Sequence, residues 1–214
     1  ALRQQSHGKN IFVARTGSGL LIFFSIFTVY FTALKDHENL QKYHNRNIIF
    51  MTCLLLIFLI IAKLGAPIAG KVDMALPLIM EDTSVYMLLP LGAGAMTVCM
   101  FLGFHVAVYF SLLLSLLVSI IISSRMDVFV FFFLSSMAGA FWVIECRQRK
   151  TFISAGFRLA LFNAILAFFL YLYAAASPEI TPVLKDAVLA ACGGFIAGVI
   201  TAGLTPVIEM LFGF

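Results

Sequence analysis

Four polar side chains that lie inside or beside long apolar runs are the first candidates for chemistry in this sequence. They are His105, Arg158, Asn163 and Glu209. Polar and ionisable groups are costly in the hydrocarbon of a membrane, and those that occur there often mark ion or substrate pathways. Each of the four could therefore contact a ligand or another charged side chain, and each also has a structural explanation.

We favour the structural explanation for each of them. Arg158 lies near the start of its run, from which its long side chain can extend to the lipid headgroups or pair with an acid such as Glu209. Asn163 lies deeper and is best explained by a hydrogen bond between helices. His105 opens a run and is expected at the membrane interface. Glu209 is expected there too, because an acid at mid-bilayer would cost ~2.5–3.5 kcal/mol.

Familiar catalytic spacings are absent from the sequence. There is no HExxH motif for zinc, the interiors of the apolar runs hold no pair of aspartates, and no histidine lies deep enough to assist a membrane serine protease. Lys185 precedes the last run, so it offers no retinal-binding lysine within a helix. The four cysteines show no CxxC spacing. The sequence therefore predicts no catalytic, metal or cofactor site within this chain.

The composition indicates which solvent surrounds the elements that carry these side chains. Apolar residues make up 62% of the chain and charged residues 11%, whereas soluble domains average about 45–50% and about 25%. Basic residues occur in clusters between apolar runs, which is typical of loops beside lipid headgroups and not of a nucleic-acid surface. We therefore expect an integral membrane protein whose main partner is lipid and which binds no nucleic acid.

Seven apolar runs are long enough to cross a bilayer as helices, since a core of ~30 Å needs about 20 apolar residues. The expected spans are 16–34, 48–64, 85–101, 105–123, 128–144, 154–176 and 187–211. Because backbone groups must be satisfied internally in lipid and the runs lack the alternation of barrel strands, the predicted fold class is all-α. It is a polytopic bundle of seven transmembrane helices over 16–214.

Two segments outside these spans are also assigned. Residues 1–15 are expected to lie beside the membrane. The stretch 65–84 is interrupted by prolines and charges, so we expect an interfacial or re-entrant connector there. An eighth, short span within it is the alternative.

Small residues recur every four positions in the last run and predict close helix packing. One row comprises Ala190, Gly194, Gly198 and Ala202, followed by Pro206, and a second row lies beside it. Small residues at this spacing let helix backbones approach closely, so the run 187–211 is expected in the middle of the bundle. The same faces would also allow a homodimer. The segment "PLGAGA" at 90–95 predicts a kink with close packing in the third span.

Charge bias gives a weak indication of orientation. The 14 Lys and Arg residues divide equally between the two sides of the seven-span arrangement, so their number alone does not decide it. On one side they are concentrated in two short segments, 42–46 and 147–150, whereas the opposite loops hold most of the acids. We therefore expect the first side to be cytoplasmic, with the N-terminus outside and the C-terminus inside.

Three stretches of the sequence resemble one family. They are "YMLLPLGAGAMTVCMFLGFHVAVYFSLLLSLLVSII" at 86–121, "SSMAGAFWVIECRQRKTFISAGFRLALFNAILA" at 135–167 and "GGFIAGVITAGLTPVIEMLFGF" at 193–214. Together they resemble the membrane region of bacterial seven-transmembrane receptors with an intracellular HD hydrolase domain, the PgpH-like group. The resemblance covers most of the chain, and the closing "GLTPVIEMLFGF" is its most specific part.

The resemblance implies an extracytoplasmic domain before the spans and a cytoplasmic HD domain after them, in a bacterial inner membrane. In the best-known members the HD domain hydrolyses cyclic di-AMP with a divalent metal pair. The catalytic His and Asp residues of the family would follow Phe214, so this chain itself is expected to hydrolyse nothing. The implied arrangement requires the N-terminus outside and the C-terminus inside, which agrees with the charge bias.

The expected function is therefore that of a sensor and relay, in which the helix at 187–211 passes a shift or rotation to the hydrolase. A small-solute transporter or channel is the main alternative, although few polar groups lie near the midplane and no repeat is evident. A passive anchor that only places the hydrolase at the membrane is the third interpretation.

Overall fold

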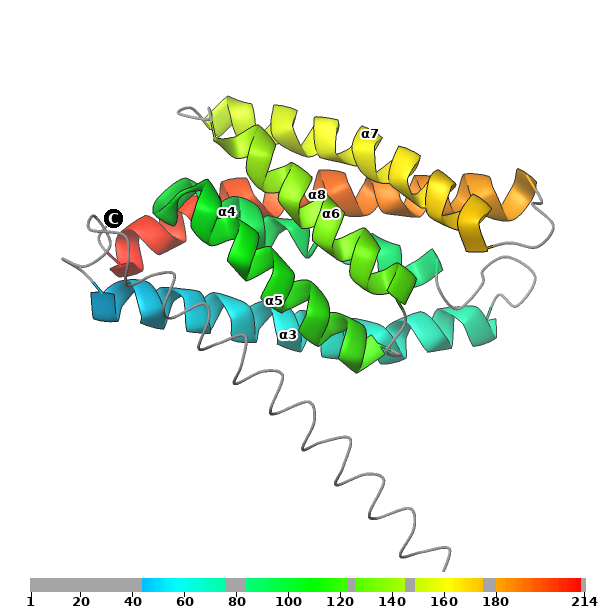
Figure 1. Cartoon of the computed structure of the whole chain (residues 1–214), viewed down its shortest axis with the longest axis horizontal. Coiled ribbons are helices and arrows are strands. Elements are labelled where there is room, and N and C mark those ends of the chain that lie inside the picture. The colour runs from blue at the N-terminus through cyan, green and yellow to red at the C-terminus, as the bar shows by residue number, and fades with distance from the viewer. Residues whose placement is uncertain (1–43, 76–83, 123–125, 145–148, 175–179, 213–214) are drawn as a thin grey trace, which may run out of the picture. The chain divides into compact units, whose positions relative to one another are not determined.

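The computed structural model describes residues 44–75, 84–122, 126–144, 149–174 and 180–212. Within these ranges it has six α-helices and one short 3-10 helix (Figure 1). They are α3 (His44–Ala75), η1 (Ser84–Leu88), α4 (Gly92–Leu102), α5 (Phe104–Ile122), α6 (Met126–Val143), α7 (Arg149–Ala174) and α8 (Ile180–Phe212). Six described segments are long and apolar enough to cross a membrane. They correspond to six of the seven expected spans. The expected span 16–34 and the segment 1–15 lie outside the described residues.

The helix bounds differ from the expected spans mainly at two places. α8 begins at Ile180 and not at 187, so its first two turns carry residues that had been assigned to a loop. α3 continues to Ala75, past the expected end at 64. At 1.5 Å per residue its 32 residues extend for about 48 Å, which exceeds the ~30 Å hydrocarbon core. The first part of the expected connector is therefore helical, and 76–83 lies outside the described residues.

α4 lies at the centre of the described helices. Its eight residues from Gly92 to Cys99 are all buried. Neighbours reach it from the five other α-helices: Phe58 of α3, Phe110 of α5, Gly139 of α6, Leu159 of α7 and Thr201 of α8. The four small residues of "GAGA" at 92–95 have almost no side chain, so these helices can approach α4 closely on every side.

Among the described helices, the middle position therefore belongs to α4 and not to the last span, contrary to the expectation. α8 has small residues on two faces, but a third face carries Phe195, Ile196 and Val199, which are exposed. Such apolar side chains suit contact with lipid. A small-residue pattern thus indicates close contact on the faces that carry it, and it does not indicate that a helix is surrounded.

The expected kink in the third span is a complete break. The 3-10 helix η1 ends at Leu88 and α4 begins at Gly92. Pro90 lies between them and has no N–H to donate, so the helical hydrogen-bond pattern cannot continue through it. At its other end α4 is followed at once by α5. Gly103 joins them with φ +92°, a conformation that favours glycine, and its N–H donates to the Cys99 carbonyl at 3.0 Å.

Candidate functional site

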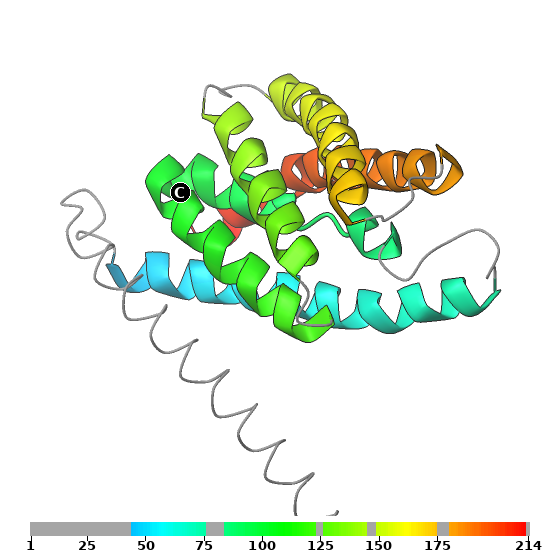
Figure 2. The ribbon, with the colours of Figure 1, turned by 45° about the vertical axis from the view of Figure 1, so that its right-hand side comes forward.

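α8 packs against α7 through glycine, and this is the most extensive helix contact among the described residues. The two helices are antiparallel and lie side by side in Figure 1 and in the turned view of Figure 2. An ideal Cβ placed on Gly198 would lie 2.5 Å from the Cα of Gly156, and one on Gly194 would lie 2.8 Å from the Cα of Ala160. Real Cβ atoms do not approach backbone so closely, so the contact requires glycine at both positions of α8.

A second row of small residues on α8 faces η1 and α4. An ideal Cβ on Gly193 would lie 2.6 Å from the Met87 carbonyl oxygen. Further along, Thr201 places its hydroxyl 3.5 Å from the Ala93 carbonyl oxygen and 3.8 Å from the Met96 sulfur. Thr205 lies 3.6 Å from the Met100 sulfur. α8 is therefore held between α7 on one face and η1–α4 on another.

The remaining members of the predicted packing row lie at its two ends. Ala190 is buried and its carbonyl faces α7. Ala202 and Pro206 are half-buried. Pro206 lies inside α8, where it cannot donate a hydrogen bond to the carbonyl one turn earlier.

Asn163 forms an interhelical hydrogen bond, as the sequence predicted. Its Nδ2 donates to the Ala190 carbonyl at 3.4 Å. The side chain is 3% exposed, and its Oδ1 has no hydrogen-bond partner among the described residues. This side chain therefore ties α7 to α8 and also presents an unused acceptor oxygen inside the bundle.

The alternative in which Arg158 pairs with Glu209 is wrong. Both side chains are exposed, and no ion pair joins them in the part of the chain that the structure describes. The contact between Gly156 and Gly198 fixes the register of α7 against α8. In that register Arg158 lies opposite the residue at 196, which is 13 residues or about 20 Å along α8 from Glu209.

His105 is exposed at the start of α5, where its ring contacts Phe104 edge to face at 6.4 Å. Its location at the membrane interface stays a prediction, as does that of Glu209. Among the described residues, no three His, Cys, Asp or Glu side chains come together as a metal site would require.

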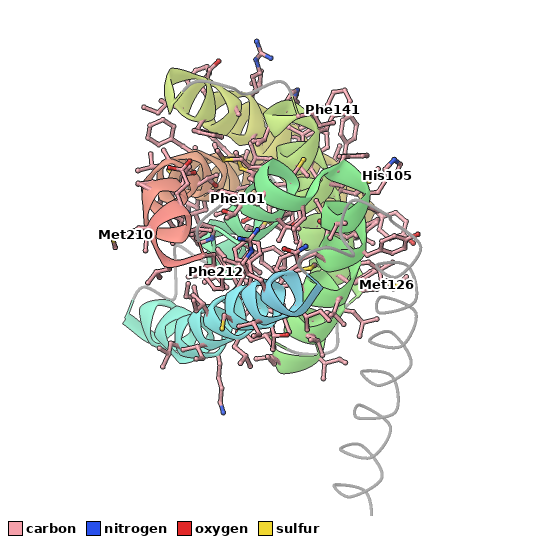
Figure 3. The ribbon with its side chains drawn as sticks, turned by 90° about the vertical axis from the view of Figure 1, so that its left-hand side faces the viewer. Phe101, His105, Met126, Phe141, Met210 and Phe212 are labelled. Carbon is pink, nitrogen blue, oxygen red and sulfur yellow. The ribbon has the colours of Figure 1, made fainter. Side chains whose placement is uncertain are left out.

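Aromatic rings join three helix ends at the C-terminal end of α8. Phe50 of α3 is 1% exposed and contacts Phe101 of α4 at 5.8 Å and Phe212 of α8 at 5.3 Å, both edge to face. Phe101 and Phe212 lie within this end of the bundle, whereas Met210 lies on its margin (Figure 3). Sequence reasoning missed the cluster because 23 phenylalanines leave no pattern that singles out three.

Asp186 is a second residue that sequence reasoning missed. It is 5% exposed within the first turns of α8, although the expected span began one residue after it. A usable pattern was present, because Asp186 precedes Ala190 by four residues and so extends the predicted packing row by one turn. An acid in a row of small packing residues is expected to be buried if the helix extends that far.

Comparison with known proteins gives one significant similarity. A family model described as "7TM receptor with intracellular HD hydrolase" matches residues 12–214. Searches of curated proteins and of solved structures found no significant match. The matched region is the membrane region, and the hydrolase domain is not within this chain.

Proposed function

This chain belongs to the family of seven-transmembrane receptors with an intracellular HD hydrolase, and from that premise we propose that it couples an extracytoplasmic or membrane signal to cyclic dinucleotide hydrolysis. The chain is the sensor and relay region, and the hydrolase is the HD domain of the same polypeptide. Cyclic di-AMP is the proposed substrate. The divalent metal pair belongs to that domain and to no residue of this chain.

The observation that carries the proposal is the packing of α8 between two partners through small residues. Its glycines contact backbone atoms of α7 and of η1. At these glycines α8 has no side chain that would have to disengage, so a shift of α8 meets less steric resistance there than it would with larger residues. Its far end contacts α3 through Phe212. A signal that favours one packing of α8 would therefore be transmitted along the whole helix to the hydrolase.

The proposed arrangement in the membrane follows from the same premise. The N-terminus lies outside, preceded by an extracytoplasmic domain, and the C-terminal end of α8 lies in the cytoplasm beside the hydrolase. The location is the inner membrane of a bacterium. A homodimer is part of the proposal, because the hydrolase domains of two copies could then respond together.

Replacement of Gly198 by alanine in the full-length receptor tests the relay. The added methyl group would meet Gly156 backbone, so the packing of α8 must change. Allosteric coupling usually amounts to about 5–150-fold, and we expect basal cyclic di-AMP hydrolysis or its response to signal to change at least about fivefold. Gly203→Ala is the matched control, because a Cβ there meets nothing within 4 Å.

The relay proposal fails if Gly198→Ala folds and inserts normally and retains both the basal activity and the response. If regulation also survives exchange of the whole bundle for an unrelated anchor, the chain is a passive anchor instead.

One observation favours a transporter or channel as the second candidate. The break between η1 and α4 interrupts a membrane-length segment next to the central helix, and interrupted helices build the substrate sites of many transporters. Uptake of small solutes by proteoliposomes that contain the full-length protein would support this candidate. Absence of flux across a broad solute panel would leave the relay as the function.

A further inference from the structure

Arg158 is a charged side chain on the outer surface of α7. It is the one charged residue between Phe152 and Tyr173, which bound the part of α7 that is apolar enough to cross a membrane. The side chain is exposed, and no hydrogen bond or ion pair holds it within the part of the chain that the structure describes. Because an uncompensated charge is costly in hydrocarbon, we expect a group outside the described residues to neutralise it.

Arg158 faces away from the helix against which α7 packs most closely. Gly156 contacts the backbone of α8, and at 100° per residue Arg158 lies about 160° from it around the axis of α7. α7 also lies at the margin of the described helices in Figures 1 and 2. Ser154, Leu161 and Ile165 lie within about 60° of one another and of Arg158, and all three are exposed. This outer face of α7 therefore carries polar side chains near the start of the helix and apolar side chains further along.

The depth of Arg158 in the membrane suits contact with a lipid phosphate. It follows Phe152, where the apolar segment begins, by six residues, which corresponds to about 9 Å along the helix axis. Helical side chains lean toward the N-terminus of their helix, and for Arg158 this is the direction of the nearer membrane surface. Its long side chain can therefore carry the guanidinium past Ser154, one turn earlier, to the level of the lipid phosphates.

A phospholipid satisfies the chemistry of this face. A guanidinium and a phosphate form paired, charge-assisted hydrogen bonds, and the Ser154 hydroxyl can donate to a third phosphate oxygen. The apolar side chains beyond Arg158 offer a surface for the acyl chains. In a zwitterionic lipid the cation of the headgroup competes with Arg158 for the phosphate, whereas an anionic phospholipid has no such cation. The basic residues at 147–150 also attract anionic lipid to the start of α7.

We propose that the outer face of α7 binds one anionic phospholipid, whose phosphate contacts Arg158 and Ser154 and whose acyl chains lie along Leu161 and Ile165. The lipid belongs to the leaflet in which α7 begins. Its binding adds a lipid ligand to the bundle whether or not the bundle relays a signal, and its test does not use the hydrolase.

Trp142 provides a local measurement, because it is the single tryptophan of this chain and lies beside the proposed site. Its ring contacts Phe162 of α7 edge to face at 5.7 Å, and Phe162 follows Arg158 by one turn. The full-length protein, with any tryptophan outside this region replaced by phenylalanine, is placed in vesicles of phosphatidylcholine and phosphatidylglycerol in varied proportion. Bromine atoms on the acyl chains of one lipid or the other quench Trp142 fluorescence only at close range, so the quenching measures which lipid lies there.

Phosphatidylglycerol is anionic and should bind at this site at least about tenfold more tightly than zwitterionic phosphatidylcholine, because hydrogen bonds to charged groups contribute about that factor in affinity. Arg158→Gln should bring the ratio of the two affinities close to one. Arg158→Lys keeps the charge but not the paired hydrogen bonds, so it should give an intermediate ratio. A purely structural role of Arg158 would not produce this graded series.

Lys63→Gln is the matched control. Lys63 is also an exposed cation within an apolar span, but it lies on α3. Its replacement removes the same charge from the protein and should leave the affinity ratio unchanged. Glycerol phosphate carries the charged phosphate without acyl chains, so its addition separates a lipid site from a site for free phosphate. It should not restore the fluorescence of Trp142.

Four outcomes contradict the proposal. One is equal quenching by the two brominated lipids, which would mean that the phosphate of any bilayer lipid suffices. The second is a preference that Arg158→Gln preserves or that Lys63→Gln removes equally, since either would show a general effect of net charge. The third is recovery of Trp142 fluorescence in glycerol phosphate, which would indicate a site for a soluble anion. The fourth is dissociation of an oligomer by Arg158→Gln in phosphatidylcholine alone, which would mean that Arg158 pairs with an acid of a second copy.

Discussion

Glycine residues, whose side chain is a single hydrogen atom, determine how closely α7 and α8 approach. An ideal Cβ on Gly156 would lie 2.8 Å from the Cα of Gly198, and the reciprocal Cβ would lie 2.5 Å from Gly156. The nearest atoms are backbone atoms, which cannot move aside as a flexible side chain can. In lipid, where helix association depends on packing and not on the hydrophobic effect, such a contact contributes a large part of the interface.

Gly156→Ala is therefore expected to destabilise the protein. Overpacking of a tight contact typically costs about 1–3 kcal/mol, and here the two helices must separate to accommodate the methyl group. The measurement is the denaturation midpoint of the full-length protein in detergent, with Gly203→Ala as the control because it leaves every contact intact. Equal midpoints for the two variants would show that the helices are not in contact at Gly156.

Asn163 shows what can and cannot be predicted for a single residue. A polar amide deep in an apolar run has to find a partner in lipid, so an interhelical hydrogen bond could be predicted from position alone. Its partner could not, because the Ala190 carbonyl is chosen by the register of two helices. The sequence predicts that Arg158 and Glu209 lie on the same side of the membrane. It does not give their relative depth, and the register of α7 against α8 separates them along the helix axis.

At the scale of the elements, hydropathy located the helices well and their ends less well. The expected span 105–123 differs from α5 (Phe104–Ile122) by one residue at each end. The sequence predicts that the second span ends at 64, because proline and charged residues follow, yet α3 continues to Ala75. Hydropathy reports which residues lie in lipid, and a helix has no need to stop where the lipid does.

The break before α4 was predicted only as a kink, for a related reason. Proline indicates that one hydrogen bond is lost, but the extent of the disruption depends on what replaces it. Here the glycines of α4 and Gly193 of α8 allow the unwound backbone to pack against a neighbouring helix. The glycines of α4 follow Pro90 closely in the sequence, but Gly193 is far from it. The pattern around Pro90 alone therefore could not distinguish a kink from a break.

Phe50 connects the ends of three elements, and its truncation should loosen all of them. It makes two edge-to-face contacts, with Phe101 and Phe212, and each such pair contributes about 0.5–1.5 kcal/mol beyond packing area. Phe50→Ala should therefore lower the free energy of unfolding by at least about 1 kcal/mol. Hydrogen exchange at the last turn of α8 should also increase.

Phe157→Ala on the outer face of α7 is the matched control for this prediction. Its ring is exposed and makes no ring contact with another described aromatic residue, so its loss should leave both the unfolding free energy and the exchange at the end of α8 nearly unchanged. If the two variants behaved alike, the aromatic cluster would have no special part in holding α8.

At the scale of the whole molecule, successive described helices alternate in direction. The start of α3 contacts the ends of α4 and α8 through the rings of Phe50, Phe101 and Phe212. The start of α5 contacts the end of α6 through the rings of Phe104 and Phe141. The other ends of α5 and α6 meet across 123–125. Each segment therefore reverses the direction of the one before it, as successive membrane spans must.

This alternation makes the orientation testable with two labels. His105 lies in the first turn of α5 and Met126 begins α6, and both are exposed. They lie at opposite ends of α5, because α6 starts four residues after α5 ends. Met126 is 75% exposed. In a background without the native cysteines, Met126→Cys should react with a membrane-impermeant maleimide in intact cells if the N-terminus is outside. His105→Cys should react only after the membrane is permeabilised.

The reverse pattern of labelling would place the C-terminal end of α8 outside the cell, where it could not adjoin a cytoplasmic hydrolase. Labelling of both variants in intact cells would mean that the alternation itself does not correspond to crossings of the membrane. Because positive charges alone divide evenly between the two sides, neither result is imposed by loop charge. Labelling of Met126→Cys alone in intact cells would support the orientation that the relay requires, in which α8 ends on the side where the hydrolase acts.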